Sequence, residues 1–130
     1  MITRQIPDEV DPSGFQKNLE ECSAPLQEMV TYLRSTARNA GADVSERRYR
    51  HPKPNSGWGV AYYADSHRFC EFNPKREKDH VWAFVHGADS SEIADEGFQP
   101  SLQDGWFQIR TLPEAVRFVK WVLLAHDGPR

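Results

Sequence analysis

The residues of this sequence with the clearest chemical potential are cations and aromatic rings that cluster in its middle third. One basic run covers residues 47–53, and a second covers residues 75–78. Cations neutralise phosphates and exposed rings stack on bases, and single-stranded nucleic acid requires both kinds of contact. The candidate binding residues are therefore Arg47, Arg48, Arg50, Trp58, Tyr62, Lys75, Arg76 and Trp82.

The same aromatic residues support two other interpretations. Trp58, Val60 and Tyr62 share one face of an expected strand, and Trp82 and Phe84 share a face of another. If those faces coincide, they would form an aromatic pocket for a small ligand. Packing in the core explains most of the rings too, because the four tryptophans of a chain this short are largely buried in a folded protein.

Catalytic and metal sites have less support. The five histidines form no HxH, HxxxH or HExxH pattern, and two cysteines without a CxxC cannot build a structural zinc site unaided. We therefore expect no metal, no cofactor and no assigned catalytic residue. One enzymatic alternative pairs Glu71 with a neighbouring histidine as acid and base, because strand pairing should place His67 across from His86.

Periodicity indicates which elements position these residues. A short helix is possible over 13–21, and a firmer one is capped by Ser23 and ended by Gly41. A final, strongly apolar helix follows Thr111, which forms a capping box with Glu114. Pro74 should exclude its segment from a central strand. The expected strands cover residues 44–50, 58–64, 67–72, 80–86 and 105–110.

This order of elements predicts an α+β fold. We expect an antiparallel sheet of about five strands, with an N-terminal and a C-terminal helix packed on one face. Residues 1–14 should form a flexible arm, and residues 15–130 a single domain. Residues 88–104 carry acids and no bases, and are expected to be a solvated excursion with a short helix near 90–94.

Composition limits the partners and the compartment. The net charge of −3 argues against a chain that coats nucleic acid over its whole surface, although a local basic patch remains compatible with it. No apolar run approaches the length of about 20 residues that a membrane-spanning helix needs. We expect a cytoplasmic protein with no membrane partner and with two buried thiols. The apolar final helix is also compatible with a homodimer, which Trp121→Glu would then convert to monomers.

Four segments together resemble a small bacterial domain family of unknown function. They are residues 41–44, Tyr62-Tyr63, the RFCEFNPK stretch at 68–75 and the GWFQIRT stretch at 105–111 with its helix. Members of that family often carry the description "predicted transport protein", and some are fused to restriction-type enzymes. The likeness covers roughly residues 24 to 126. It implies the α+β fold and a non-catalytic role, and it implies no cofactor or site.

The sequence thus favours a non-catalytic interaction or ligand-binding domain whose partner is a protein, a nucleic acid or a small molecule. One alternative is a nucleic-acid-binding module that uses the basic runs 47–53 and 75–78. The other is a small enzyme built on Glu71.

Overall fold

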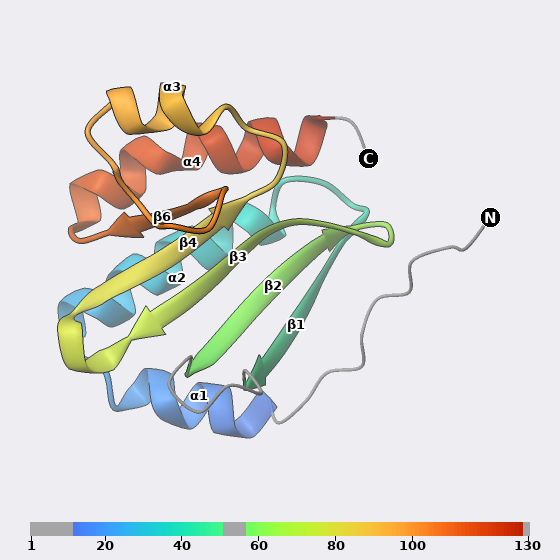
Figure 1. Cartoon of the computed structure of the whole chain (residues 1–130). Helices are drawn as coiled ribbons and strands as arrows, with labels where there is room; N and C mark the ends of the chain where they lie inside the picture. Colours follow the sequence, from blue (N-terminus) through green and yellow to red (C-terminus); the bar gives the residue numbers. More distant parts are fainter. Residues whose placement is uncertain (1–11, 51–56, 129–130) are drawn as a thin grey trace.

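The computed structural model describes residues 12–50 and 57–128, which fold into one mixed helix-and-sheet unit (Figure 1). Every strand pairs antiparallel, in the order β1-β2-β3-β4-β6-β5. The predicted α+β class is confirmed, with β5 as a short additional edge strand. The elements are α1 (Pro12–Glu20), α2 (Ala24–Arg38), β1 (Val44–Arg50), β2 (Trp58–Ala64), β3 (His67–Lys75), the 3-10 turn η1 (Arg76–Lys78), β4 (His80–Val85), α3 (Ser90–Asp95), β5 (Gln99–Pro100), β6 (Trp106–Ile109) and α4 (Leu112–Asp127).

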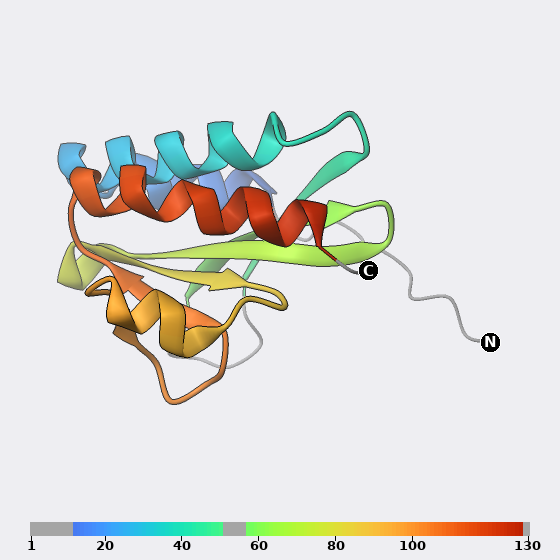
Figure 2. The same ribbon diagram turned by 90° about the horizontal axis from the view of Figure 1, so that it is seen from above.

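Helices α2 and α4 lie side by side over one face of the sheet, as Figure 2 shows. Their apolar residues meet alternate strand residues such as Val60, Phe72 and Phe107, which are fully buried. Helix α1 packs at the end of the sheet against β1 and β2. Short α3 lies by the β5–β6 edge, where Phe98 contacts Phe118 of α4. The core therefore lies between the sheet and the helices, and we call the opposite side of the sheet the outer face.

Helices α2 and α4 begin at the predicted caps. The Ser23 hydroxyl accepts a hydrogen bond from the Leu26 amide at 3.3 Å, and the Thr111 hydroxyl accepts one from the Glu114 amide at 3.2 Å. The predicted role of Gly41 is wrong, because α2 already ends at Arg38. A Cβ at Gly41 would lie 2.8 Å from Nε2 of His126, so this glycine permits a close approach to α4.

The start of α1 and the end of β3 also differ from the boundaries that the sequence predicts. Helix α1 starts at Pro12, so residues 12–14 are helical, while residues 1–11 of the predicted arm lie outside the described residues. Strand β3 continues through Pro74 to Lys75. Its pairing with β2 stops at Phe72, so Pro74 lies where β3 is paired on the β4 side alone. A proline is tolerated there because its missing N–H is not needed for a second ladder.

A β-bulge in β3 decides which side chains reach the outer face. Tyr62 pairs with Cys70, but the next residue, Tyr63, pairs with Arg68, so Phe69 is an extra residue. Phe69 is fully buried and contacts His126 on the helix side. The extra residue brings Arg68 and Glu71, three positions apart, to the same face, where regular alternation would separate them.

Candidate functional site

A cleft of about 480 Å³ opens at the end of the sheet where β1 ends, β2 begins and β3 runs into η1. It collects five of the predicted binding residues, which come from β1, β2, the junction of β3 with η1, and β4. We call this site the basic cleft. Its lining residues are Asn18, Arg50, Gly57, Trp58, Pro74, Lys75, Arg76, Glu77, Lys78 and Trp82.

Cations outnumber acids in the basic cleft. Arg50 lies over the Trp58 ring, with its guanidinium carbon 5.7 Å from the ring centroid. Arg76 forms an ion pair with Glu21, at the end of α1. Within residues 12–50 and 57–128, neither Arg50 nor Lys78 forms an ion pair. The cleft therefore holds positive charge that the surrounding described residues only partly neutralise.

Lys75 experiences this positive charge directly. Its side chain is half-buried between the start of β2 and η1, and its Nζ approaches Gly57. Burial and the nearby Lys78 ammonium together lower the pKa of Lys75 below its usual value. A bound anion would relieve both effects, since it would compensate for the lost solvation and offset the charge of Lys78.

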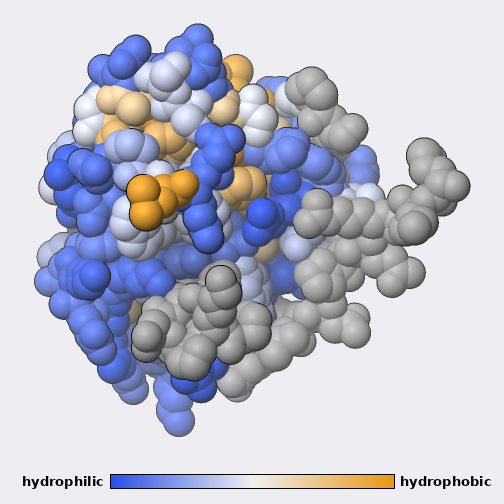
Figure 3. All heavy atoms as spheres, viewed as in Figure 1, coloured by the Kyte–Doolittle hydropathy of each residue, from blue (hydrophilic) through white to orange (hydrophobic). Residues whose placement is uncertain are grey.

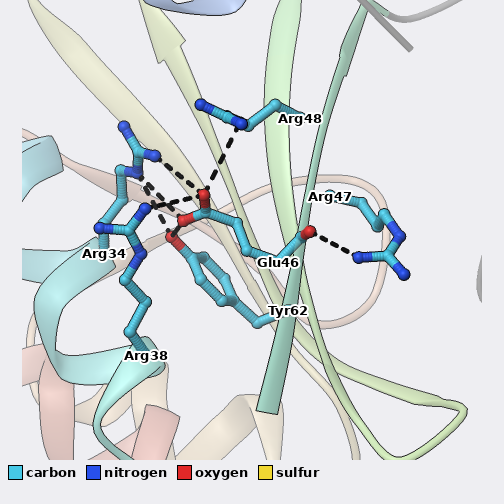
Figure 4. A network of polar contacts seen from close by, with 6 residues as sticks. All are labelled: Arg34, Arg38, Glu46, Arg47, Arg48 and Tyr62. Atoms are coloured by element: carbon cyan, nitrogen blue, oxygen red, sulfur yellow. Dashed lines mark hydrogen bonds and ion pairs between the residues drawn. The ribbon is translucent and has the colours of Figure 1, made fainter. Parts of the chain in front are cut away.

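Two more of the predicted residues, Arg48 and Tyr62, belong to a different group that surrounds Glu46 (Figure 4). The Glu46 carboxylate accepts hydrogen bonds from Tyr62 at 2.5 Å and from Arg34 and Arg38 at 3.0 Å, while Arg48 lies at 3.7 Å. We call this group the Glu46 cluster. Arg34 is only 8% exposed and packs over Phe15 of α1.

The Glu46 cluster has a structural role, because it connects α2 to the sheet. Burial alone would raise the pKa of Glu46, but hydrogen bonds from Tyr62 and Arg34 hold it below its usual value. Tyr62 is fully buried, so it cannot stack on a ligand as the sequence suggested. Arg48 is directed to a carboxylate of the protein itself, and the predicted single patch over 47–53 is therefore divided.

Arg47 completes this division, because alternation along β1 points it to the outer face, away from Arg48 and Arg50. Its guanidinium donates a hydrogen bond to the backbone carbonyl of Glu46 at 2.8 Å, and Figure 4 shows it on the other side of the strand. Residues 51 and 53 of the predicted run lie outside the described residues. Of the three candidate arginines on β1, only Arg50 reaches the basic cleft.

The proposed acid–base pair is not assembled. His67 and His86 do meet, with ring centroids 4.3 Å apart, as strand pairing predicted. His86 also borders a small cavity of about 190 Å³ lined by Trp121 and Leu124 of α4, so this pair lies on the helix side. Glu71 lies on the outer face, fully buried, with its carboxylate 2.8 Å from Arg68. The sheet separates Glu71 from both histidines.

The remaining side chains that could act as nucleophiles or metal ligands are not arranged for either role in the described residues. Cys22 and Cys70 are buried thiols, and burial raises the pKa of each, which disfavours the nucleophilic thiolate. Among the described residues, no group of three or more histidine, cysteine or acidic side chains is arranged to hold a metal ion. The basic cleft is therefore the place where the described side chains offer binding chemistry.

Helix α4 exposes less apolar surface than its composition suggests. Trp121 is 8% exposed, and its indole N–H donates a hydrogen bond to Glu96 at 3.1 Å. Trp121→Glu would consequently damage the core, so it cannot serve as a test of dimerisation. A homodimer through α4 stays a prediction that would use the exposed Val116, Leu123 and Leu124. No helix of the described residues, α4 included, is long and apolar enough to span a membrane.

Comparison of the chain with protein-family models, with curated proteins and with solved structures gives no match in any of the three searches. The resemblance to a small bacterial domain family accordingly stays a prediction.

Proposed function

We propose that this domain binds single-stranded nucleic acid in the basic cleft. The observation that carries the proposal is the combination, in one cleft, of the Trp58 and Trp82 rings with the cations Arg50, Lys75 and Lys78. Phosphates need the cations, and unpaired bases offer flat faces to the rings. The proposal falls within the broader class of non-catalytic binding domains that the sequence favours.

The size and charge of the cleft support a local site. A volume of about 480 Å³ lies within the range of roughly 300–1,000 Å³ for ligand pockets, which fits one or two nucleotide units. The net charge of the chain is −3, so attraction for a polyanion has to come from the cleft itself and not from the molecule as a whole. A cytoplasmic location is part of the proposal, since both cysteines are free thiols.

The test is the affinity of fluorescently labelled decathymidylate and decauridylate, measured by anisotropy at low salt. Replacing both cleft lysines, Lys75→Ala with Lys78→Ala, should weaken binding about tenfold, because two phosphate contacts are lost. The melting temperature should stay unchanged, since Lys78 is exposed and Lys75 is half-exposed.

A matched control removes two cations elsewhere. Arg117→Ala with Lys120→Ala changes the net charge equally, but both residues lie on α4, where they bond to Glu96. This control should bind both oligonucleotides like the wild type. Absence of binding by either strand, or an equal loss in the two double variants, would overturn the proposal.

A further inference from the structure

The outer face of the sheet continues the surface of the basic cleft. Strand register places Trp82 and Phe84 of β4, Trp106 and Gln108 of β6, and Arg68 of β3 on this face. The two tryptophans are half-buried, so each ring keeps surface that a ligand can reach. Figure 3 views the molecule from this side, where hydrophilic and hydrophobic residues are interspersed.

Arg68 is held on this face by two contacts. Its guanidinium carbon lies 4.3 Å from the centroid of the Phe84 ring, and Nη1 lies 2.8 Å from the Glu71 carboxylate. Glu71 is fully buried, so its carboxylate lies beneath the surface. The Arg68 side chain is 30% exposed, so its guanidinium keeps surface that a ligand can reach. Arginine planes stack on bases.

Aromatic surface connects this arginine with the cleft. Trp82 lines the cleft and lies two residues before Phe84 on the same strand, about 7 Å away at strand rise. The Phe84 ring lies 5.4 Å from that of Trp106 on the neighbouring strand. Trp82, the Arg68–Phe84 stack and Trp106 thus form a short series of flat groups that begins at the cleft.

The distribution of basic and acidic residues favours one path for a polyanion across this surface. Lys75 and Lys78 lie at the cleft end, and Arg68 lies near the other end of β3. Residues 88–104, which precede Trp106 in the chain and include α3 and β5, are acidic and would repel phosphates. The acids are Asp89, Glu92, Asp95, Glu96 and Asp104. A strand leaving the cleft would therefore keep its phosphates on the β3–β4 side and lay bases on the rings.

We infer that the ligand is a single strand several nucleotides long, whose bases leave the basic cleft over Trp82 and stack on Arg68 and Trp106 of the outer face. This inference rests on the proposed function and adds to it a second set of contacts. A dinucleotide fills the cleft alone, whereas a decanucleotide also covers the outer face.

The experiment compares thymidylyl dinucleotide and decathymidylate, with decauridylate as the RNA counterpart, on two outer-face variants. Trp106→Leu removes one stacking surface, and Arg68→Lys keeps the charge beside Glu71 while removing the planar guanidinium. Each variant should lose roughly tenfold in affinity for the decanucleotides and nothing for the dinucleotide. The matched controls are Leu102→Ala on the loop before β6, and Arg110→Lys, which alters another arginine–carboxylate pair on the surface.

The possible outcomes distinguish a failure of the outer-face inference from a failure of the proposed function. If both lengths bind and neither Trp106→Leu nor Arg68→Lys weakens the decanucleotides more than its control does, the outer-face inference is wrong while the cleft proposal stands. If no oligonucleotide binds the wild type, the proposed function itself fails, and the inference fails with it. Melting curves of each variant show whether a loss of affinity comes from unfolding. The two variants change different strands of the sheet, so they test the inference independently.

Discussion

Arg48 and Arg50 are two positions apart on the same face of β1, yet they belong to two different groups of cations. Arg48 joins the Glu46 cluster, where three arginines and a tyrosine surround one partly buried carboxylate. Arg50 reaches the basic cleft, where it lies over Trp58 with no ion pair to any described residue. Arg48 therefore helps to stabilise the fold, whereas Arg50 remains available to an anion. What separates them is the distance to Glu46, which lies two residues before Arg48 on the same strand and four residues before Arg50.

The largest effect should come from removing that carboxylate. Glu46→Gln leaves Arg34 buried without a compensating charge, so we expect a loss of about 3 kcal/mol in the free energy of unfolding. Arg38 binds the same carboxylate, but its side chain is 55% exposed, so Arg38→Gln should cost less than about 1 kcal/mol. Chemical denaturation of the two variants provides the comparison.

Oligonucleotide affinity of the folded Glu46→Gln protein should equal that of the wild type. A large loss of affinity with little loss of stability would mean that the Glu46 cluster belongs to the binding site, and the contrast between the two groups would then be wrong.

A smaller effect concerns the ion pair that Arg76 of the basic cleft forms with Glu21. Glu21 pairs with Arg76 and competes with a ligand for that guanidinium. Glu21→Gln should therefore raise oligonucleotide affinity about threefold, as expected for an exposed ion pair. Glu20→Gln makes the same charge change one residue away, on a side chain that bonds to Gln16, and it should raise affinity less. Equal gains from both variants would indicate a general charge effect without a role for Arg76.

The smallest effect is a pH dependence of stability outside the cleft. Hydrogen bonds to Asp127 and Asp43 raise the pKa of His126 above its usual value of about 6.5. The stabilisation is complete below about pH 6.5 and is lost as pH rises through the pKa of the folded protein. The difference in melting temperature between the wild type and His126→Gln should therefore shrink from acidic to mildly alkaline pH. A difference that grows with pH would contradict this assignment.

Local patterns were sufficient for most of the architecture. Caps at Ser23 and Thr111, alternation in the strands and short turns predict the helices and the meander, because these depend on neighbouring residues. The bulge at Phe69 and the continuation of β3 through Pro74 depend on pairing with other strands. Neither had a signal in the sequence, and the bulge decides where Arg68 points.

The site was only partly predictable for the same reason. Composition identified the cations and rings, and alternation alone could have separated Arg47 from Arg48 and Arg50. The contacts of Arg48 and Tyr62 required the position of α2, which brings Arg34 and Arg38 to Glu46. The presence of Asn18 in the cleft similarly depends on how α1 packs at the end of the sheet.

The salt dependence of decathymidylate binding tests the central claim most directly. With Arg50, Lys75 and Lys78 each neutralising a phosphate, the logarithm of the affinity should fall with the logarithm of salt concentration with a slope of about −2. The variant that combines Lys75→Ala with Lys78→Ala should lower the magnitude of the slope by about 1.4, whereas Arg117→Ala with Lys120→Ala should leave it unchanged. A wild-type affinity independent of salt, or equal slopes in the two double variants, would contradict binding at the basic cleft.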